Sequence, residues 1–180
     1  MRGSVAAEGR RFDEHMLVKL EDGRLWMLIR TIYGIAESFS SDLGVTWSDP
    51  VPSRFAHVNR GARIFFRRLA SGNLLLIKHG EIRETTDKRS HLRAFLSDDE
   101  GQTRTDALLI DEREGISYPD GFQSPDGALY IIYDRNRSKD REILLSRFTE
   151  EDILAGRLVS ENSQRRILVH KAAGNLNDTN

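Results

Sequence analysis

The stretch that decides the fold is Ser40–Trp47, which reads SSDLGVTW and follows the pattern S-x-D-x-G-x-T-W. Asp42 is expected to accept hydrogen bonds from backbone N–H groups two residues further on, because aspartate stabilises turns in this way. Gly44 permits a positive φ that other residues resist. Thr46 and Trp47 are expected to start the next strand, with the indole buried against the sheet beneath it.

A second octapeptide, Ser97–Arg104, reads SDDEGQTR and keeps Ser97, Asp99, Gly101 and Thr103. The two key aspartates lie 57 positions apart (99 − 42 = 57). A period near 50 residues with turns at matching places indicates a propeller or a similar repeat architecture. The shared pattern resembles the Asp box, the turn that recurs in sialidases (neuraminidases) and related β-propellers. The resemblance implies that both octapeptides are structural turns on the outer side of the blades and bind no metal.

Three turns that contain glycine each precede an apolar run. The turn glycines are Gly23, Gly72 and Gly127, and the runs that follow them cover residues 24–29, 73–77 and 128–133. Strand, Gly turn and strand together predict a hairpin in each repeat. A third strand is expected at 34–40, 91–96 and 142–148, and a fourth, outer strand at 166–170. Thr149 is expected to cap a single helical turn that begins with acidic residues.

The sequence therefore predicts an all-β fold of three four-stranded antiparallel blades. The expected blades cover residues 12–52, 60–111 and 116–172, within one partial propeller (12–180) that follows a flexible lead-in (1–11). Propellers usually have four to eight blades, so three blades do not close a ring. The resemblance implies about half of a six-bladed sialidase-type propeller, namely its C-terminal half. A fragment that dimerises and a misassigned gene start are alternatives, and open blade edges predict self-association.

Composition excludes several classes of protein. The 180 residues are 38% hydrophobic and 31% charged, with a net charge of −1 and no cysteine. No basic stripe supports nucleic-acid binding, and no apolar run approaches the roughly 18 residues of a membrane-spanning helix. The scattered histidines fit no zinc motif, so neither a metal nor another cofactor is expected. The compartment stays undetermined: no signal peptide is visible, and the family resemblance suggests an exported or periplasmic parent.

The resemblance to sialidases extends to candidate site residues. Sialidases place a glutamate and an arginine around the inner hairpin of one blade, and Glu14 and Arg30 fall on these two positions. A further arginine precedes a later Asp box in the family, and Arg89 matches it by spacing better than Arg83 or Arg93. We also consider a role for Arg63, although most arginines beside a strand are solvated.

Tyr118 stands where the family has its nucleophilic tyrosine, ahead of the turn at 125–127. Arginine binds carboxylates through two parallel hydrogen bonds, which suits an acidic sugar. A neutral tyrosine is not repelled by the sugar carboxylate, as an anionic nucleophile would be. Glu14 would accept the phenol proton, and Arg30, Arg89 and Arg63 would bind the substrate. Ordinary structural roles remain open for each of these residues.

Three departures from the family pattern are visible. No segment matches the first arginine of the sialidase triad or the aspartate that acts as general acid, and Pro119 follows the tyrosine where sialidases commonly have serine. Residues 134–137 follow an apolar strand and are interpreted as a plain inter-strand loop, although they could rim the pocket.

The predicted function is a sialidase-like glycoside hydrolase acting on an acidic sugar, inactive without the other half of the propeller. The alternatives are a non-catalytic glycan-binding propeller, a scaffold for protein partners and a polysaccharide lyase acting on uronic acids.

Overall fold

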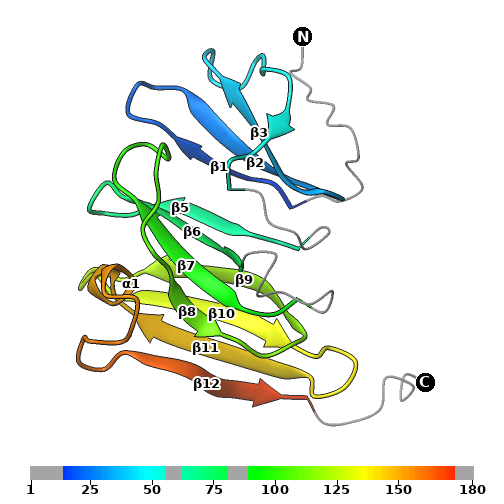
Figure 1. The fold of residues 1–180 in the computed structure, drawn as a ribbon, viewed down its shortest axis with the longest axis vertical. Helices are drawn as coiled ribbons and strands as arrows, with labels where there is room; N and C mark the ends of the chain where they lie inside the picture. The colour runs from blue at the N-terminus through cyan, green and yellow to red at the C-terminus, as the bar shows by residue number, and fades with distance from the viewer. Residues whose placement is uncertain (1–13, 56–61, 81–88, 173–180) are drawn as a thin grey trace.

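The structure, a computed structural model, describes residues 14–55, 62–80 and 89–172. Within these ranges twelve strands and one short helix form three four-stranded antiparallel sheets, which lie one beside the next along the long axis (Figure 1). The expected lead-in at 1–11 lies outside the described residues, and so does Arg83. None of the described helices is long and apolar enough to cross a membrane.

Each sheet is a meander in which the strand order follows the chain. The first sheet has β1 (Met16–Lys19), β2 (Leu25–Thr31), β3 (Gly34–Ser40) and β4 (Val51–Pro52). The second has β5 (Phe65–Arg68), β6 (Leu74–His79), β7 (Leu92–Ser97) and β8 (Leu108–Asp111). The third has β9 (Ile116–Gln123), β10 (Leu129–Arg135), β11 (Glu142–Phe148) and β12 (Gln164–Lys171), with α1 (Glu150–Leu154) between the last two. These sheets are blades of a partial β-propeller, as the sequence predicted.

The first hairpin of every sheet turns in the same way. In the second sheet Leu69 N donates to Asn73 O at 2.8 Å, and Gly72 N donates to Leu69 O at 3.0 Å. The other two hairpins have the same pair of bonds, and the turn glycines have φ values of +89°, +97° and +85°. A Cβ at any of them would meet no atom within 4 Å, so glycine is favoured by the backbone conformation and not by lack of space.

Strand β6 explains why the middle repeat is continuously apolar. Leu74 and Leu76 pack in the core shared with the first sheet, whereas Leu75 and Ile77 pack in the core shared with the third. Since both faces of β6 are covered, all of its residues are buried, and successive leucines and Ile77 alternate between the two cores. Burial of each such side chain contributes about 1.5–3 kcal/mol.

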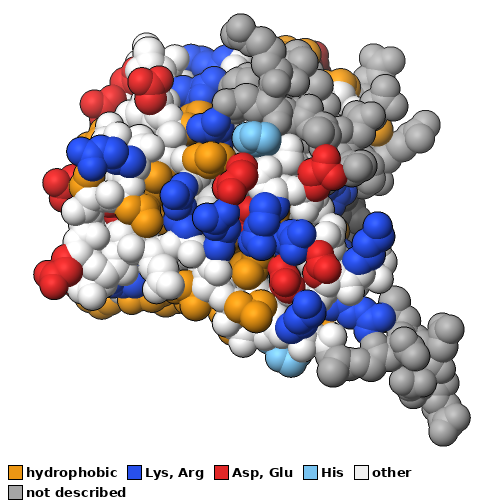
Figure 2. All heavy atoms as spheres, turned by 60° about the horizontal axis from the view of Figure 1, so that its bottom comes forward, with side chains coloured by type: hydrophobic (Ala, Val, Ile, Leu, Met, Phe, Trp, Pro, Cys, Tyr) orange, Lys and Arg blue, Asp and Glu red, His pale blue; other side chains and the backbone are white. Residues whose placement is uncertain are grey.

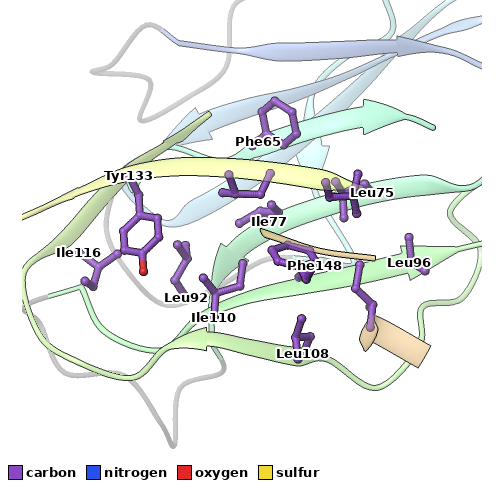
Figure 3. Close-up of a cluster of buried hydrophobic side chains, with 14 of the residues drawn as sticks. Phe65, Leu75, Ile77, Leu92, Leu96, Leu108, Ile110, Ile116, Tyr133 and Phe148 are labelled. Atoms are coloured by element: carbon purple, nitrogen blue, oxygen red, sulfur yellow. The ribbon is translucent and has the colours of Figure 1, made fainter. Parts of the chain in front are cut away.

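The two cores differ in character. The first is aromatic: the Trp26 ring lies 5.8 Å from Phe39, 5.9 Å from Phe55 and 5.0 Å from Phe66, centroid to centroid. The second is mainly aliphatic and is shown in Figure 3. Together they join the three sheets into one body.

The two octapeptide turns have the same hydrogen bonds. Asp42 accepts from the Ser40 hydroxyl at 2.8 Å, from Thr46 N at 2.8 Å and from the Thr46 hydroxyl at 2.6 Å. Asp99 accepts from the equivalent atoms of Ser97 and Thr103 at 2.7, 2.9 and 2.6 Å. Led by the threonine hydroxyl, these hydrogen bonds lower the pKa of each aspartate to about 2. The two turns are therefore equivalent in structure as well as in sequence.

The structure corrects two details of these turns. The backbone donor to Asp42 lies four residues further on, at Thr46, and not two. Thr46 and Trp47 do not start a strand, because β4 begins only at Val51. Trp47 is half-buried, and its indole N–H donates to Gly44 O at 3.1 Å, so the ring closes its own turn.

Strand β9 is longer than the sequence suggested. Pro119 and Gly121 interrupt the apolar pattern ahead of the turn at 125–127, yet β9 runs through both of them. Proline is tolerated here because β9 is an edge strand and its pairing with β10 shifts at a bulge between Ile132 and Asp134. A Cβ at Gly121 would lie 2.1 Å from Tyr130 O, so close approach of the two backbones requires glycine there.

Candidate functional site

The predicted site residues gather at one end of the sheets. The first hairpins of the sheets and both octapeptide turns lie at the opposite end, on the side of α1 in Figure 1. In an antiparallel meander the first strands begin where the second strands end. The predicted residues occupy these places, before β1 (Glu14), late in β2 (Arg30), before β5 (Arg63), before β7 (Arg89) and in β9 (Tyr118).

Tyr118 lies among guanidinium groups. Cζ of Arg137, in the loop after β10, is 3.6 Å from the centre of the Tyr118 ring, and Cζ of Arg63 is 5.9 Å from it. The charges of Arg137, Arg30 and Arg89 also act on the Tyr118 phenol. Cations over the face of an aromatic ring are attracted by its quadrupole. Figure 2 shows Lys and Arg side chains gathered beside Asp and Glu on one face of the molecule.

Arg30 is the buried member of this group, with 5% of its side chain exposed, and its guanidinium forms an ion pair with Glu14. Burial lowers the pKa of Arg30 and the charge of Arg89 lowers it further, while Tyr118 opposes both. Arginine nevertheless stays charged in proteins. Two guanidinium groups that repel each other, one of them buried, are stabilised when an anion binds between them.

The same charges act on the Tyr118 phenol. Burial raises its pKa, but the hydrogen bond and charge of Arg137, with the charges of Arg30 and Arg89, outweigh burial. The pKa of Tyr118 therefore lies below its ordinary value. A lowered pKa is one of the ways in which a weak nucleophile is activated.

Six described residues at this end have a positive φ, in the left-handed region that favours glycine. They are Glu14 (+71°), Arg89 (+57°), His91 (+54°), Tyr118 (+54°), Asn136 (+48°) and Arg141 (+53°). Such strain costs about 1–3 kcal/mol per residue and tends to cluster where geometry serves a function. Leu43 and Glu100, in the two octapeptide turns at the opposite end, also have positive φ values, so this strain does not by itself distinguish the site.

Backbone contacts tie the second and third sheets together next to Tyr118. Ile116 N donates to Arg89 O at 3.0 Å, and Nε2 of His79 donates to Ile116 O at 3.0 Å. Burial lowers the pKa of His79 to about 4, so its imidazole is neutral near pH 7. These contacts fix the start of β9, and with it the place of Tyr118 relative to Arg89.

The expected contact between Glu14 and Tyr118 takes a different form. Within the described residues Glu14 pairs with Arg30, and the charge of Arg30 in turn acts on Tyr118, so the link between Glu14 and the phenol is indirect. Arg63 is partly engaged as well, because it pairs with Asp120 at 3.1 Å. The structure thus brings Arg30, Arg63 and Arg89 to the surroundings of Tyr118, and it places Glu14 on Arg30.

Sequence reasoning gave little weight to Asp134 and Arg137. The spacing from the turn glycines could have indicated the position of Asp134. Arg30, His79 and Asp134 each lie seven residues after the turn glycine of their repeat (30 − 23, 79 − 72 and 134 − 127). Alignment of the repeats on their glycines would have directed attention to the ends of the second strands. Among the residues that the structure describes, no cluster of His, Asp or Glu could hold a metal ion.

Comparison with known proteins agrees with the fold and with this arrangement of repeats. Residues 2–131 match the BNR repeat-like domain. The chain belongs to this family. Among curated protein sequences, none matches the chain.

Two solved structures are similar to this BNR-repeat chain. One is the crystal structure of the intramolecular trans-sialidase from Ruminococcus gnavus in complex with oseltamivir carboxylate, with a TM-score of 0.61 and 22% identity over 78% of this chain and 33% of that one. The other is described as a sialidase, with a TM-score of 0.58 and 26% identity over 76% of this chain and 13% of that one. The BNR-repeat chain therefore spans a third or less of the length of these two structures.

Proposed function

We propose that this BNR-repeat chain carries part of the active site of a sialidase-like glycoside hydrolase that acts on an acidic sugar. The observation that supports the proposal is the convergence of Arg30, Arg89 and Arg137 on the phenol of Tyr118. The guanidinium groups come from all three sheets, so their meeting is a property of the fold and not of one local segment. The likeness to a structure described as a sialidase adds to this support.

The arginines suit the carboxylate of an acidic sugar. Arg30 is buried and forms an ion pair with Glu14 in the structure. In the proposed complex the sugar carboxylate takes the place of Glu14 on Arg30, with Arg89 and Arg63 as further ligands. Bidentate pairs between arginine and carboxylate are among the strong hydrogen bonds in proteins, and they would fix the reacting carbon beside Tyr118.

Release from Arg30 gives Glu14 its proposed role. The freed carboxylate accepts the proton of Tyr118, and the phenol oxygen attacks the anomeric carbon. The glycosidic C–O bond breaks, and the leaving oxygen takes up a proton. We assign no residue of this chain to that last proton transfer. The chain alone is therefore proposed to be inactive on ordinary glycosides, which need a general acid.

Glycosyl fluorides test the nucleophile without a general acid, because fluoride leaves unprotonated. A sialyl fluoride that also carries fluorine at C3 reacts with an active tyrosine, and the second fluorine slows hydrolysis of the adduct. Mass spectrometry of the wild-type protein should find one sugar on the peptide that contains Tyr118. The Tyr118→Phe variant should stay unmodified, and the Tyr33→Phe variant should react like the wild type. A uronyl fluoride tested in parallel identifies the class of acidic sugar.

Binding without an adduct would contradict the hydrolase and favour the non-catalytic glycan-binding alternative. Calorimetric titration with free sialic acid and glucuronic acid detects that case. We further propose that the turns around Asp42 and Asp99 are Asp boxes with a structural role, because each aspartate is occupied by hydrogen bonds within its own turn.

A further inference from the structure

The loop between β10 and β11 brings a guanidinium onto the face of the Tyr118 ring. Arg137 Cζ lies 3.6 Å from the ring centre, closer than Arg63 Cζ at 5.9 Å. Arg137 and Tyr118 both belong to the third sheet and its loops. Their contact is thus independent of how the three sheets sit against one another.

Asp134 holds Arg137 in this place. Its Oδ2 accepts from Arg137 Nε, and its Oδ1 accepts from the hydroxyl of Ser117, the residue before Tyr118. One carboxylate therefore ties together the backbone that carries the tyrosine and the guanidinium that covers it. Charge-assisted hydrogen bonds of this kind are stronger than neutral ones and fix geometry.

The loop that carries Arg137 is itself well determined. Asn136 N donates to Gly115 O at 2.9 Å, Asn136 Nδ2 donates to Asp140 Oδ2 at 2.7 Å, and Asn136 O accepts from Arg141 N at 2.9 Å. A Cβ at Gly115 would lie 1.8 Å from Asn136 Oδ1, so the loop fits tightly against the strand that leads to Tyr118. The backbone that carries Arg137 is thus held in place by these contacts of the loop.

We propose that Arg137, held by Asp134, is a positioning residue of Tyr118 that stabilises its phenolate form. The proposal rests on the proposed role of Tyr118 as nucleophile. In the free protein the phenol O–H bond breaks, the proton passes to water, and the electron pair stays on the oxygen beside the guanidinium. In the proposed sugar complex, Glu14 released from Arg30 takes that proton, and Arg137 stabilises the phenolate that forms.

The charged groups around Tyr118 come from every neighbouring element. They are Arg30 from β2, Arg63 before β5, Arg89 before β7, Asp120 within β9, Asp134 within β10 and Arg137 in the loop after β10. Asp120 is paired with Arg63, and Asp134 with Arg137, so each acid is matched by one arginine. Arg30, which is paired with Glu14, and Arg89 also act on the phenol through their positive charges.

The test is a pH titration of Tyr118 in the full chain. Carbon-13 labelled tyrosine gives one ring signal per tyrosine, and the signal that disappears in Tyr118→Phe belongs to Tyr118. In Arg137→Gln its midpoint should shift upward, because a stabilising charge is lost. Arg137→Lys should shift it less, since the charge stays but the planar fork is lost. Lys139→Gln removes a charge from an exposed residue of the same loop and should leave the midpoint unchanged.

An unchanged midpoint in folded Arg137→Gln would overturn the proposal, as would an equal upward shift in Lys139→Gln. If Arg137→Gln fails to fold, Asp134→Asn serves instead, because it leaves the arginine in place but unheld. It should also shift the midpoint upward, and no shift would again overturn the proposal. Failure of the proposed function gives a different result from failure of this proposal. The wild type would then form no adduct with any sugar fluoride, while the midpoint of the Tyr118 titration would still change in Arg137→Gln.

Discussion

Replacement of Asp152 by asparagine should destabilise the third sheet by a calculable amount. The carboxylate is fully buried and serves the segment that leads from α1 to β12. Its Oδ1 accepts from Val159 N at 2.6 Å and Ser160 N at 2.8 Å. Its Oδ2 accepts from Thr149 N at 2.8 Å and from the Ser163 hydroxyl at 2.5 Å. An asparagine NH₂ in either position would face donors instead of accepting from them.

The magnitude follows from the pKa of Asp152. Burial raises this pKa, but hydrogen bonds from Ser163, Ser160, Val159 and Thr149 outweigh burial and lower it from 3.8 to about 2. One pKa unit corresponds to about 1.4 kcal/mol, so the ionised carboxylate stabilises the fold by about 2 kcal/mol. Because the folded-state pKa lies below the unfolded one, this contribution is complete above about pH 4 and disappears as the pH falls through about 2.

Urea unfolding followed by circular dichroism measures the effect. At neutral pH Asp152→Asn should lose about 2 kcal/mol of the free energy of unfolding, and the gap to the wild type should narrow between about pH 4 and pH 2. Glu151→Gln is the matched control, because Glu151 is exposed on the same helical turn and should change stability by less than about 0.5 kcal/mol. A gap that stays constant in acid, or equal losses in the two variants, would refute the reasoning.

Three further predictions concern other parts of the fold. Gly101→Ala should cost about 2–3 kcal/mol in urea unfolding because its Cβ would lie 2.2 Å from the Trp26 ring, whereas Gly72→Ala, with open space around it, should cost only about 1 kcal/mol; similar costs would contradict this. Ile132 is 41% exposed on the third sheet, so Ile132→Lys should reduce self-association in sedimentation velocity, and an unchanged profile would exclude that face as the contact. Asp99 should titrate near pH 2 by carboxyl NMR; a midpoint near 4 would show that its turn is open in solution.

Much of the fold could be predicted because its signals are local. The turn glycines and the runs after them depend only on neighbouring residues, and the structure has hairpins at all three places. Thr149 caps α1 as expected, and its own backbone N–H donates to the Asp152 carboxylate, which completes a capping box. Strand β9 was harder, because Pro119 and Gly121 are strand breakers unless an edge position and a bulge accommodate them.

The candidate site was predictable only in part. Tyr118 and Arg30 came from family resemblance, and the structure places them together. Arg137 could not be found in this way, because its position depends on a loop that folds back against Gly115. Glu14 was expected to contact the phenol directly, but it pairs with Arg30. Its position in the sequence does not determine which side chain it pairs with in the fold. Long-range pairing of charged side chains is set by the assembled sheets.

The central claim is that an acidic sugar binds at the end of the sheets that carries Tyr118. The most direct test is an NMR titration of the isotope-labelled chain with sialic acid and, separately, with glucuronic acid. The account predicts saturable shifts of Tyr118 and of the guanidinium signals of Arg30 and Arg89, lost in Arg30→Gln. Shifts confined to the hairpin-turn end near Gly72, or no saturable shift with either acid, would contradict it.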